Sequence, residues 1–456
     1  MNNKTYDLTQ GKILNKLLLV ALPIMGTSLF TMFHSLIDMF LLGRISSDVV
    51  AAAGVASMFV WLSGFLNTIG QSGAAIGVSQ SIGRKDYNQA KSYSTSATLL
   101  ALSLGFILGL FYFSQSSLLI SFFNIQDQDV YWMASQYLSI IGIGLPFQFV
   151  LLSLSSTFNA TGNSRLPFII QSIGILINII LNILLIFYLE MGIQGAAIAT
   201  ICAHISTCLI LLILIKYGSN KPFDLYKYMD IFKIKIDYIK QIFKWTIPIS
   251  AETFIYPALT IIVQRNIASF GTNPLAVYSI GAQIESLTWT VGAAFSSAVT
   301  IFVGQNYGAQ LFKRILNGIK VSFKLMFIYG FFVSLLLFFG ARFFYAFFVT
   351  NQEVINLGQT YLRIFALIQI LICIEYVCSA CFRGLGKTLY PSSVAMIGNI
   401  LRVFLSYLLS RTTLGITGIW IGLALGSFFI SISMILLYYV KIYRKKHLFI
   451  QGGQLG

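Results

Sequence analysis

The stretch VSQSIG at residues 78–83 decides the fold, because it returns later in the chain as VGQNYG at residues 303–308. Two more pairs of short segments match in the same order: FNATGN (158–163) with FRGLGK (382–387), and GIQG (192–195) with GITG (415–418). The offset stays between 223 and 227 residues across the match of residues 13–216 with residues 240–441. The chain is therefore a tandem duplication of one structural unit.

Composition shows that the repeated unit belongs in a membrane. Hydrophobic residues make up 57% of the 456 positions, charged residues 10%, and mean hydropathy is +0.81. A bilayer-spanning helix needs about 20 mostly apolar residues. Six such stretches occur in each repeat: 13–42, 50–81, 92–113, 131–157, 166–188 and 192–216, then 241–268, 275–306, 316–339, 355–381, 390–410 and 415–441. We therefore expect an all-α membrane protein with 12 transmembrane helices.

The net charge of +16 is a topology signal. When the spans alternate in direction, 24 of the 30 Lys and Arg residues fall on one side of the membrane. The positive-inside rule then predicts that both termini are cytoplasmic. The absence of a transit or internal targeting peptide fits a bacterial inner membrane. No nucleic-acid partner is expected, and no obligatory protein partner is evident.

An even number of spans per repeat brings the second repeat into the membrane in the same orientation as the first. The predicted architecture is two six-helix lobes related by a pseudo-two-fold axis along the membrane normal. The predicted boundaries are an N-terminal lobe at 1–216, a cytoplasmic linker at 217–239, a C-terminal lobe at 240–441 and a cytoplasmic tail at 442–456. Such paired bundles are typical of transporters with alternating access.

Ionisable side chains within apolar spans are costly and usually face a cavity or a partner. Asp38 lies on the first span in line with His34, Thr31 and Thr27, whose spacings place all four on one helix face. This polar stripe predicts a surface that faces away from lipid. A buried carboxylate can hold a proton or a small cation, so Asp38 is the leading coupling-ion residue, with Na⁺ as the metal, and His34 is a possible contact or proton relay.

Three polar residues on the fifth and sixth spans fall at a depth comparable with that of Asp38. They are Asn178 and Asn182, one turn apart, and Thr200 on the next span. Amide and hydroxyl oxygens together with a carboxylate are ligands for hard cations. The alternative is that they form hydrogen bonds that hold the lobe together.

The second repeat has Val263 where the first has Asp38, and its own acids lie elsewhere. Glu252, Glu285 and Glu375 fall within the seventh, eighth and tenth spans, and are candidate substrate or ion contacts. Ion pairing inside the bundle with Arg265, Arg363 or Arg402 is the alternative.

The sequence does not favour an enzyme. It lacks a GxxxxGK[ST] phosphate loop, and it has no HExxH, GxSxG or paired-carboxylate pattern. No cofactor is expected, and energy for transport would come from an ion gradient or from a partner. The five cysteines fit no metal-binding template.

The chain resembles the multidrug and toxic compound extrusion (MATE) family, whose superfamily also contains flippases for lipid-linked oligosaccharides. The resemblance covers nearly the whole chain. It rests on short motifs in order: Pro23 and Asp38, the glycine-rich end of span 2 with Arg84, Lys85 and Asp86, residues 158–162, GIQGAA at 192–197, Glu285, GQNYGA at 304–309, and RGLG at 383–386.

This resemblance implies an antiporter that exports organic, often cationic, drugs while admitting Na⁺ or H⁺. It implies that Asp38 is the coupling-ion residue of the first lobe, with partners at Asn178, Asn182 and Thr200. Glu252 and Glu285 inherit a weaker role, and some members carry Asp where this chain has Asn182. Two alternatives stay open: a flippase for a lipid-linked sugar or another amphiphile, which would need a strongly cationic cavity, and a membrane scaffold without transport.

Overall fold

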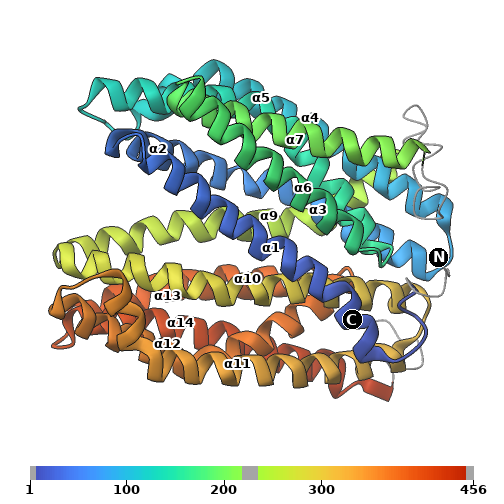
Figure 1. Ribbon diagram of the computed structural model, residues 1–456. Coiled ribbons are helices and arrows are strands. Elements are labelled where there is room, and N and C mark those ends of the chain that lie inside the picture. The colour runs from blue at the N-terminus through green and yellow to red at the C-terminus, as the bar shows by residue number, and fades with distance from the viewer. Residues whose placement is uncertain (1–6, 218–234, 448–456) are drawn as a thin grey trace. The chain divides into compact units, whose positions relative to one another are not determined.

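The computed structural model describes residues 7–217 and 235–447 (Figure 1). The first repeat contains α1 (Ile13–Gly43), α2 (Ser47–Leu62), α3 (Gly64–Gly83), α4 (Tyr87–Ser121), α5 (Gln128–Ala160), α6 (Arg165–Asn182), the π-helix η1 (Ile183–Tyr188) and α7 (Gly192–Tyr217). The second contains α9 (Ile236–Ala268), α10 (Thr272–Gly308), α11 (Phe312–Phe348), α12 (Gln352–Gly384), α13 (Leu389–Ser410), α14 (Gly415–Tyr438) and the π-helix η3 (Tyr439–Tyr443).

Eleven helices of the described chain are long and apolar enough to cross a membrane, and the bent pair α2 and α3 together makes a twelfth. No strand occurs in the described ranges. These observations confirm the predicted all-α membrane fold. Most of the predicted linker lies at residues 218–234, outside the described residues, as does the tail from residue 448.

The duplication is visible in the backbone as well as in the sequence. Gly162 and Gly386 occupy matching positions, and their φ angles are 88° and 74°. Lys85 and Gln310 also match, with φ angles of 60° and 59°. Left-handed backbone of this kind is rare for a residue with a Cβ atom. Its recurrence shows that both repeats turn in the same way after their second span and their fourth span.

The chain packs as two compact units whose borders cut across two helices. One unit contains Leu22–Ser250, and the other contains Leu8–Ala21 together with Ala251–Gly456. The start of α1, up to Ala21, therefore packs in the second unit, and the start of α9, up to Ser250, packs in the first unit. Each of these two helices passes from one unit to the other next to a proline, Pro23 in α1 and Pro248 in α9.

Specific contacts fix both of these exchanged segments. Leu8 is fully buried, its N–H donates to Gln305 Oε1 at 3.1 Å, and its carbonyl accepts from Asn306 and Arg314. In the first unit, the Trp245 ring lies 5.4 Å from that of Tyr93. The motif at the end of α10, one of the pair that revealed the duplication, therefore also binds Leu8 through Gln305 and Asn306.

The span predicted at 50–81 is not one straight helix. It breaks at Ser63 into α2 and α3, which are inclined by 41°. Ser63 is followed by Gly64, and its hydroxyl donates to the carbonyl of Val60 at 2.5 Å. Serine–glycine pairs are a common cause of sharp kinks, because the backbone is free to turn and a hydroxyl bonds a released carbonyl. The matching helix of the second repeat, α10, has no such break.

Close helix packing within the first unit depends on small residues. A Cβ atom at Gly142 of α5 would stand 2.7 Å from the carbonyl oxygen of Gly109 on α4, which is too close for any real contact. A Cβ atom at Gly70 of α3 would meet the Ala101 side chain of α4 at 2.8 Å. The glycines therefore allow the backbones to approach, as small residues do in membrane helix pairs.

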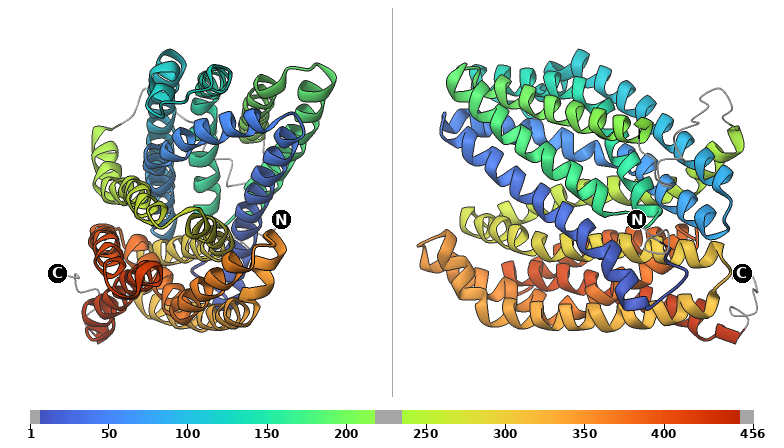
Figure 2. Two further views of the ribbon diagram at one scale, coloured as in Figure 1. Left: turned by 90° about the vertical axis from the view of Figure 1, so that its left-hand side faces the viewer. Right: turned by 45° about the vertical axis from the view of Figure 1, so that its right-hand side comes forward.

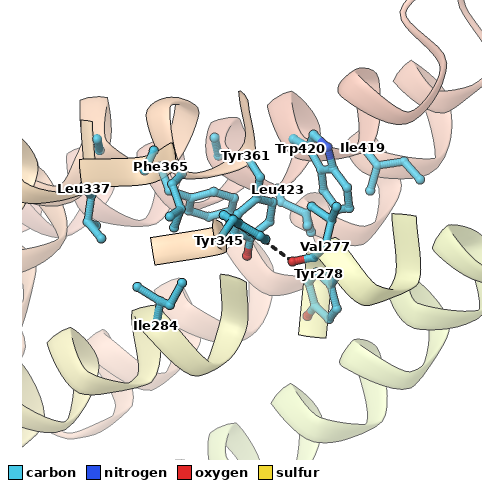
Figure 3. Close-up of a cluster of buried hydrophobic side chains, with 14 of the residues drawn as sticks. Val277, Tyr278, Ile284, Leu337, Tyr345, Tyr361, Phe365, Ile419, Trp420 and Leu423 are labelled. Atoms are coloured by element: carbon cyan, nitrogen blue, oxygen red, sulfur yellow. Dashed lines mark hydrogen bonds between the residues drawn. The ribbon is translucent and has the colours of Figure 1, made fainter. Parts of the chain in front are cut away.

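The core of the second unit is aromatic (Figure 3). Tyr345, Tyr361 and Trp420 are among its largest fully buried side chains. The Tyr345 hydroxyl donates to the carbonyl of Val277 at 2.7 Å, and the Trp420 ring lies edge-on to that of Tyr361 at 5.0 Å. This cluster joins α10, α11, α12 and α14, which lie beside one another in the second unit (Figure 2). Tyr361 of this cluster lies beside Glu285, one of the polar residues described below.

Candidate functional site

The polar stripe predicted on the first span lines cavities of the first unit. Thr27 and Thr31 each donate a hydrogen bond to the carbonyl four residues earlier, at 3.0 Å and 2.9 Å. These local bonds satisfy hydroxyl groups in an apolar helix. Thr31 and His34 line one cavity of about 160 Å³, and Thr27 and Thr31 line another of about 290 Å³.

A chain of hydrogen bonds connects Asp38 to the three polar residues predicted as its partners. Asn182 Nδ2 donates to Asp38 Oδ1 at 2.7 Å and to Asn178 Oδ1 at 2.8 Å. Asn178 Nδ2 in turn lies 3.3 Å from Thr200 Oγ1. The carboxylate thus continues into an amide and hydroxyl network that spans α1, α6 and α7. The structure brings together all four residues, which lie up to 162 positions apart in the sequence.

His34 completes this cluster from the same helix as Asp38. Its Nε2 lies 3.5 Å from Asp38 Oδ2, one helical turn away. The side chains of His34 and Asp38 are 17% and 25% exposed, whereas Asn178 and Asn182 are each only 1% exposed. The acid thus lies at the accessible edge of the network and the amides at its buried end. An ion or proton that reached Asp38 would meet oxygen atoms already held in place.

The backbone around Asn182 departs from a regular α-helix. Asn182 is the last residue of α6, and the π-helix η1 begins at Ile183. A π-turn carries one extra residue per turn and is often found at functional sites. Here it follows directly after the two amides, and the Asn182 amide donates to both Asp38 and Asn178. No residue pattern in the sequence predicts this change of helix type.

In the second unit, Glu252 is held in an ion pair. Arg383 Nη2 lies 3.0 Å from Glu252 Oε1 and 3.1 Å from Oε2, and the Ser392 hydroxyl donates to Oε2 at 2.8 Å. Arg265, Arg363 and Arg402 had been the expected partners for the acids of this lobe, so for Glu252 the partner is a different arginine. Arg383 belongs to the RGLG motif, which had been used only as a mark of resemblance.

The other two acids of the second unit share a cavity. Glu285 of α10 and Glu375 of α12 line a space of about 270 Å³ together with Arg402 of α13. Tyr256, Trp289 and Tyr376 form aromatic parts of its wall. The structure therefore places Glu285 and Glu375 in a cavity and Glu252 in an ion pair outside its lining.

Tyr137 is a neighbour of Asp38 that the sequence did not indicate. It comes from α5, whereas the predicted partners came from α6 and α7. One tyrosine among 23 in the chain carries no distinguishing pattern. Its match with Tyr361 in the second repeat would have been a usable signal, since Tyr361 lies beside Glu285 in the second unit.

Twelve apolar spans in two repeats, each with polar residues gathered around a cavity, define a membrane transporter. A family model described as MatE matches residues 23–184 and 248–408, one segment in each repeat. The chain belongs to the MatE family, whose members are transporters rather than enzymes. The resemblance predicted from the motifs is confirmed.

Relatives and solved structures agree with this assignment over almost the whole chain. The probable multidrug resistance protein NorM of Thermotoga maritima is 24% identical over 90% of this chain and 89% of its own. The probable multidrug resistance protein YoeA of Bacillus subtilis is 25% identical over 94% of each chain. An outward-facing multidrug resistance MATE family transporter of the MOP superfamily matches with a TM-score of 0.90 at 19% identity, over 97% of this chain and 98% of that one. At this identity the structural match speaks for the fold alone.

Proposed function

We propose that this transporter exports organic, often cationic, compounds by antiport with Na⁺ or H⁺. The observation that carries the proposal is the hydrogen-bonded chain from Asp38 through Asn182 and Asn178 to Thr200. The relatives are named as probable multidrug resistance proteins, which supports drug-like substrates. The positive-inside pattern supports a topology with both termini in the cytoplasm, and the bacterial sources of the relatives support an inner-membrane location.

Asp38 is the group that exchanges the ion. A carboxylate in an apolar helix is stabilised when it binds a proton or a cation, because either removes an uncompensated charge. Among the described residues no cluster of three His, Cys, Asp or Glu residues could hold a metal ion. Na⁺ would therefore meet one carboxylate, and its other ligands would be neutral oxygens from the network around Asn178 and Thr200.

Drug and ion are coupled through the state of this cluster. A proton or Na⁺ on Asp38 changes which hydrogen bonds the Asn182 amide can make, since the amide now donates to the carboxylate. The thermodynamic requirement is that ion and drug bind the two conformations of the transporter with different affinities. The polar cavities next to the cluster, lined by Thr31, His34 and Gln171, offer space for part of a substrate.

The cavity linings do not favour the flippase alternative. A site for a pyrophosphate would need several arginines or lysines. The cavities of the described transmembrane region that contain the candidate residues have Arg402 and the two histidines, His34 and His204, as their basic side chains.

Dye efflux from inverted membrane vesicles tests the proposal. Ethidium transport would be measured with an imposed Na⁺ gradient and, separately, with an imposed proton gradient. We expect Asp38→Asn to lower gradient-driven transport at least tenfold, while Asp129→Asn, which removes an exposed acid at the start of α5, leaves it unchanged. Full gradient-driven transport by Asp38→Asn would contradict the assignment of the coupling residue.

A further inference from the structure

The cavity of the second unit has the composition of a binding site. Its wall contains two carboxyl groups, those of Glu285 and Glu375, and one guanidinium group, that of Arg402. The three come from three different helices, α10, α12 and α13, so only the folded unit brings them to the same space. Opposite charges around a single cavity can bind the opposite charges of one ligand.

Two of these polar groups have atoms without a hydrogen-bond partner. Glu285 is only 1% exposed, and its Oε1 accepts no hydrogen bond from any described residue. Arg402 Nε is likewise buried without an acceptor in the described chain. Leaving a buried charged group unpaired costs more than leaving a neutral one unpaired. Both residues line the cavity, so these atoms are unused hydrogen-bonding capacity in its wall.

Glu285 and Arg402 interact electrostatically, but they form no direct ion pair. Ion pairs of the described chain include His34 with Asp38 and Glu252 with Arg383, and the pair of Glu285 with Arg402 is not among them. Glu252 of the same unit differs from Glu285, because its carboxylate accepts hydrogen bonds from both Arg383 and Ser392. Glu285 and Arg402 are instead separate groups on the wall of a common space.

The rest of the wall is suited to a flat ring. Trp289, Tyr376 and Tyr256 line the cavity, and the Arg402 guanidinium lies 6.0 Å from the centre of the Tyr256 ring. Aromatic faces bind both rings and cations. The volume of about 270 Å³ lies just below the usual range of about 300–1,000 Å³ for drug-sized ligands. The ligand should be correspondingly small.

We propose that this cavity binds small zwitterionic aromatic compounds of the size of an aromatic amino acid. The ammonium group of the ligand pairs with Glu285 and Glu375, its carboxylate pairs with Arg402, and its ring packs against Trp289 and Tyr376. This inference rests on the proposed export function, since it adds a substrate class to that function and assigns it to the second unit. The two cavities described in the first unit have no arginine in their linings for the same purpose.

Three small ligands test the charge requirement without any mutation. Equilibrium binding of radiolabelled L-phenylalanine, 2-phenylethylamine and 3-phenylpropionate would be measured on the purified transporter in lipid nanodiscs. The second probe lacks the carboxylate and the third lacks the amine. We expect phenylalanine to bind at least tenfold more tightly than either. Equal binding of phenylalanine and 2-phenylethylamine, or no saturable binding of phenylalanine, would overturn the proposal.

Two variants then assign the charges to residues. Arg402→Gln should weaken phenylalanine binding at least tenfold and leave 2-phenylethylamine binding within twofold of wild type. Glu285→Gln should weaken both ligands, and Asp129→Asn, at the exposed start of α5, should weaken neither. Phenylalanine binding that is unchanged in both second-unit variants would contradict the assignment. No ion gradient is present in this assay, so its outcome is independent of the vesicle test of Asp38.

Discussion

The two units are built from copies of one repeat, but their polar side chains differ at matching positions. In the first, Asp38 approaches Asn182 and Asn178, and Tyr137 is a neighbour. In the second, the position of Asn178 holds Arg402, and that of Tyr137 holds Tyr361. The acidic residue lies on a different helix in each unit. In the first unit it is Asp38 on α1, and the matching position on α9 is Val263. In the second unit it is Glu285 on α10.

A second pair of matching positions differs in the same way. Thr27 and Asn159 line the cavity of about 290 Å³ in the first unit. The matching residues of the second unit are Glu252 and Arg383, which form the ion pair at 3.0 Å. A polar space in one unit thus corresponds to an internal salt bridge in the other. The duplication preserved the turns and spans, because these are set by glycines and apolar length, while the polar positions changed independently.

The largest effect should come from the pair Asn182 and Ser406, which stand at matching positions. Asn182→Ala removes the donor to both Asp38 and Asn178, so ion-driven ethidium efflux from vesicles should fall at least tenfold. Ser406 donates only to the carbonyl of Val403 three residues earlier, so Ser406→Ala should change the rate less than twofold. Equal losses in the two variants would show that the units are not functionally distinct at this position.

A smaller effect, on stability, is expected where α4 crosses α5 and α11 crosses α12. Gly109→Ala would force a methyl group against the carbonyl of Gly142, and overpacking of this kind costs about 1–3 kcal/mol. At the matching place in the second unit, Ser334 donates to the carbonyl of Ala366 at 2.7 Å. Ser334→Ala should cost about 0.6 kcal/mol, the average for a hydrogen bond between membrane helices. Unfolding in detergent would measure both, and a larger loss for Ser334→Ala would reverse the predicted order.

The smallest difference concerns the ion pair and its polar counterpart. Glu252→Gln removes the charge that pairs with Arg383, and because both side chains are more than a fifth exposed we expect a cost of about 1 kcal/mol, the upper end for a solvent-screened pair. Thr27→Val, at the matching place, loses only a local bond and should cost under about 0.5 kcal/mol. The exchange Glu252→Arg with Arg383→Glu should restore most of the lost unfolding free energy. If the exchanged pair is as unstable as Glu252→Gln, the electrostatic explanation is wrong.

The sequence predicted the spans and the meeting of Asp38 with Asn178, Asn182 and Thr200, because helical periodicity and depth in the membrane restrict which polar side chains can meet. It did not predict the break at Ser63 or the π-helix after Asn182. These depend on a choice between nearly equal backbone conformations, which packing decides. The pairing of Glu252 with Arg383 was also missed, because three other arginines were equally consistent with the pattern.

The two units exchange the starts of the helices α1 and α9. Leu8–Ala21 and the start of α9 are matching segments of the repeat, and each completes the core of the unit formed by the other repeat. A reciprocal exchange of one element is the arrangement of a domain-swapped dimer, here joined into one polypeptide. A single repeat carries one such segment, and in the packing seen here that segment belongs to the other unit, so a lone repeat would reproduce this arrangement by pairing with a second copy. The two halves of this transporter are therefore folding partners, because each supplies a helix segment to the core of the other.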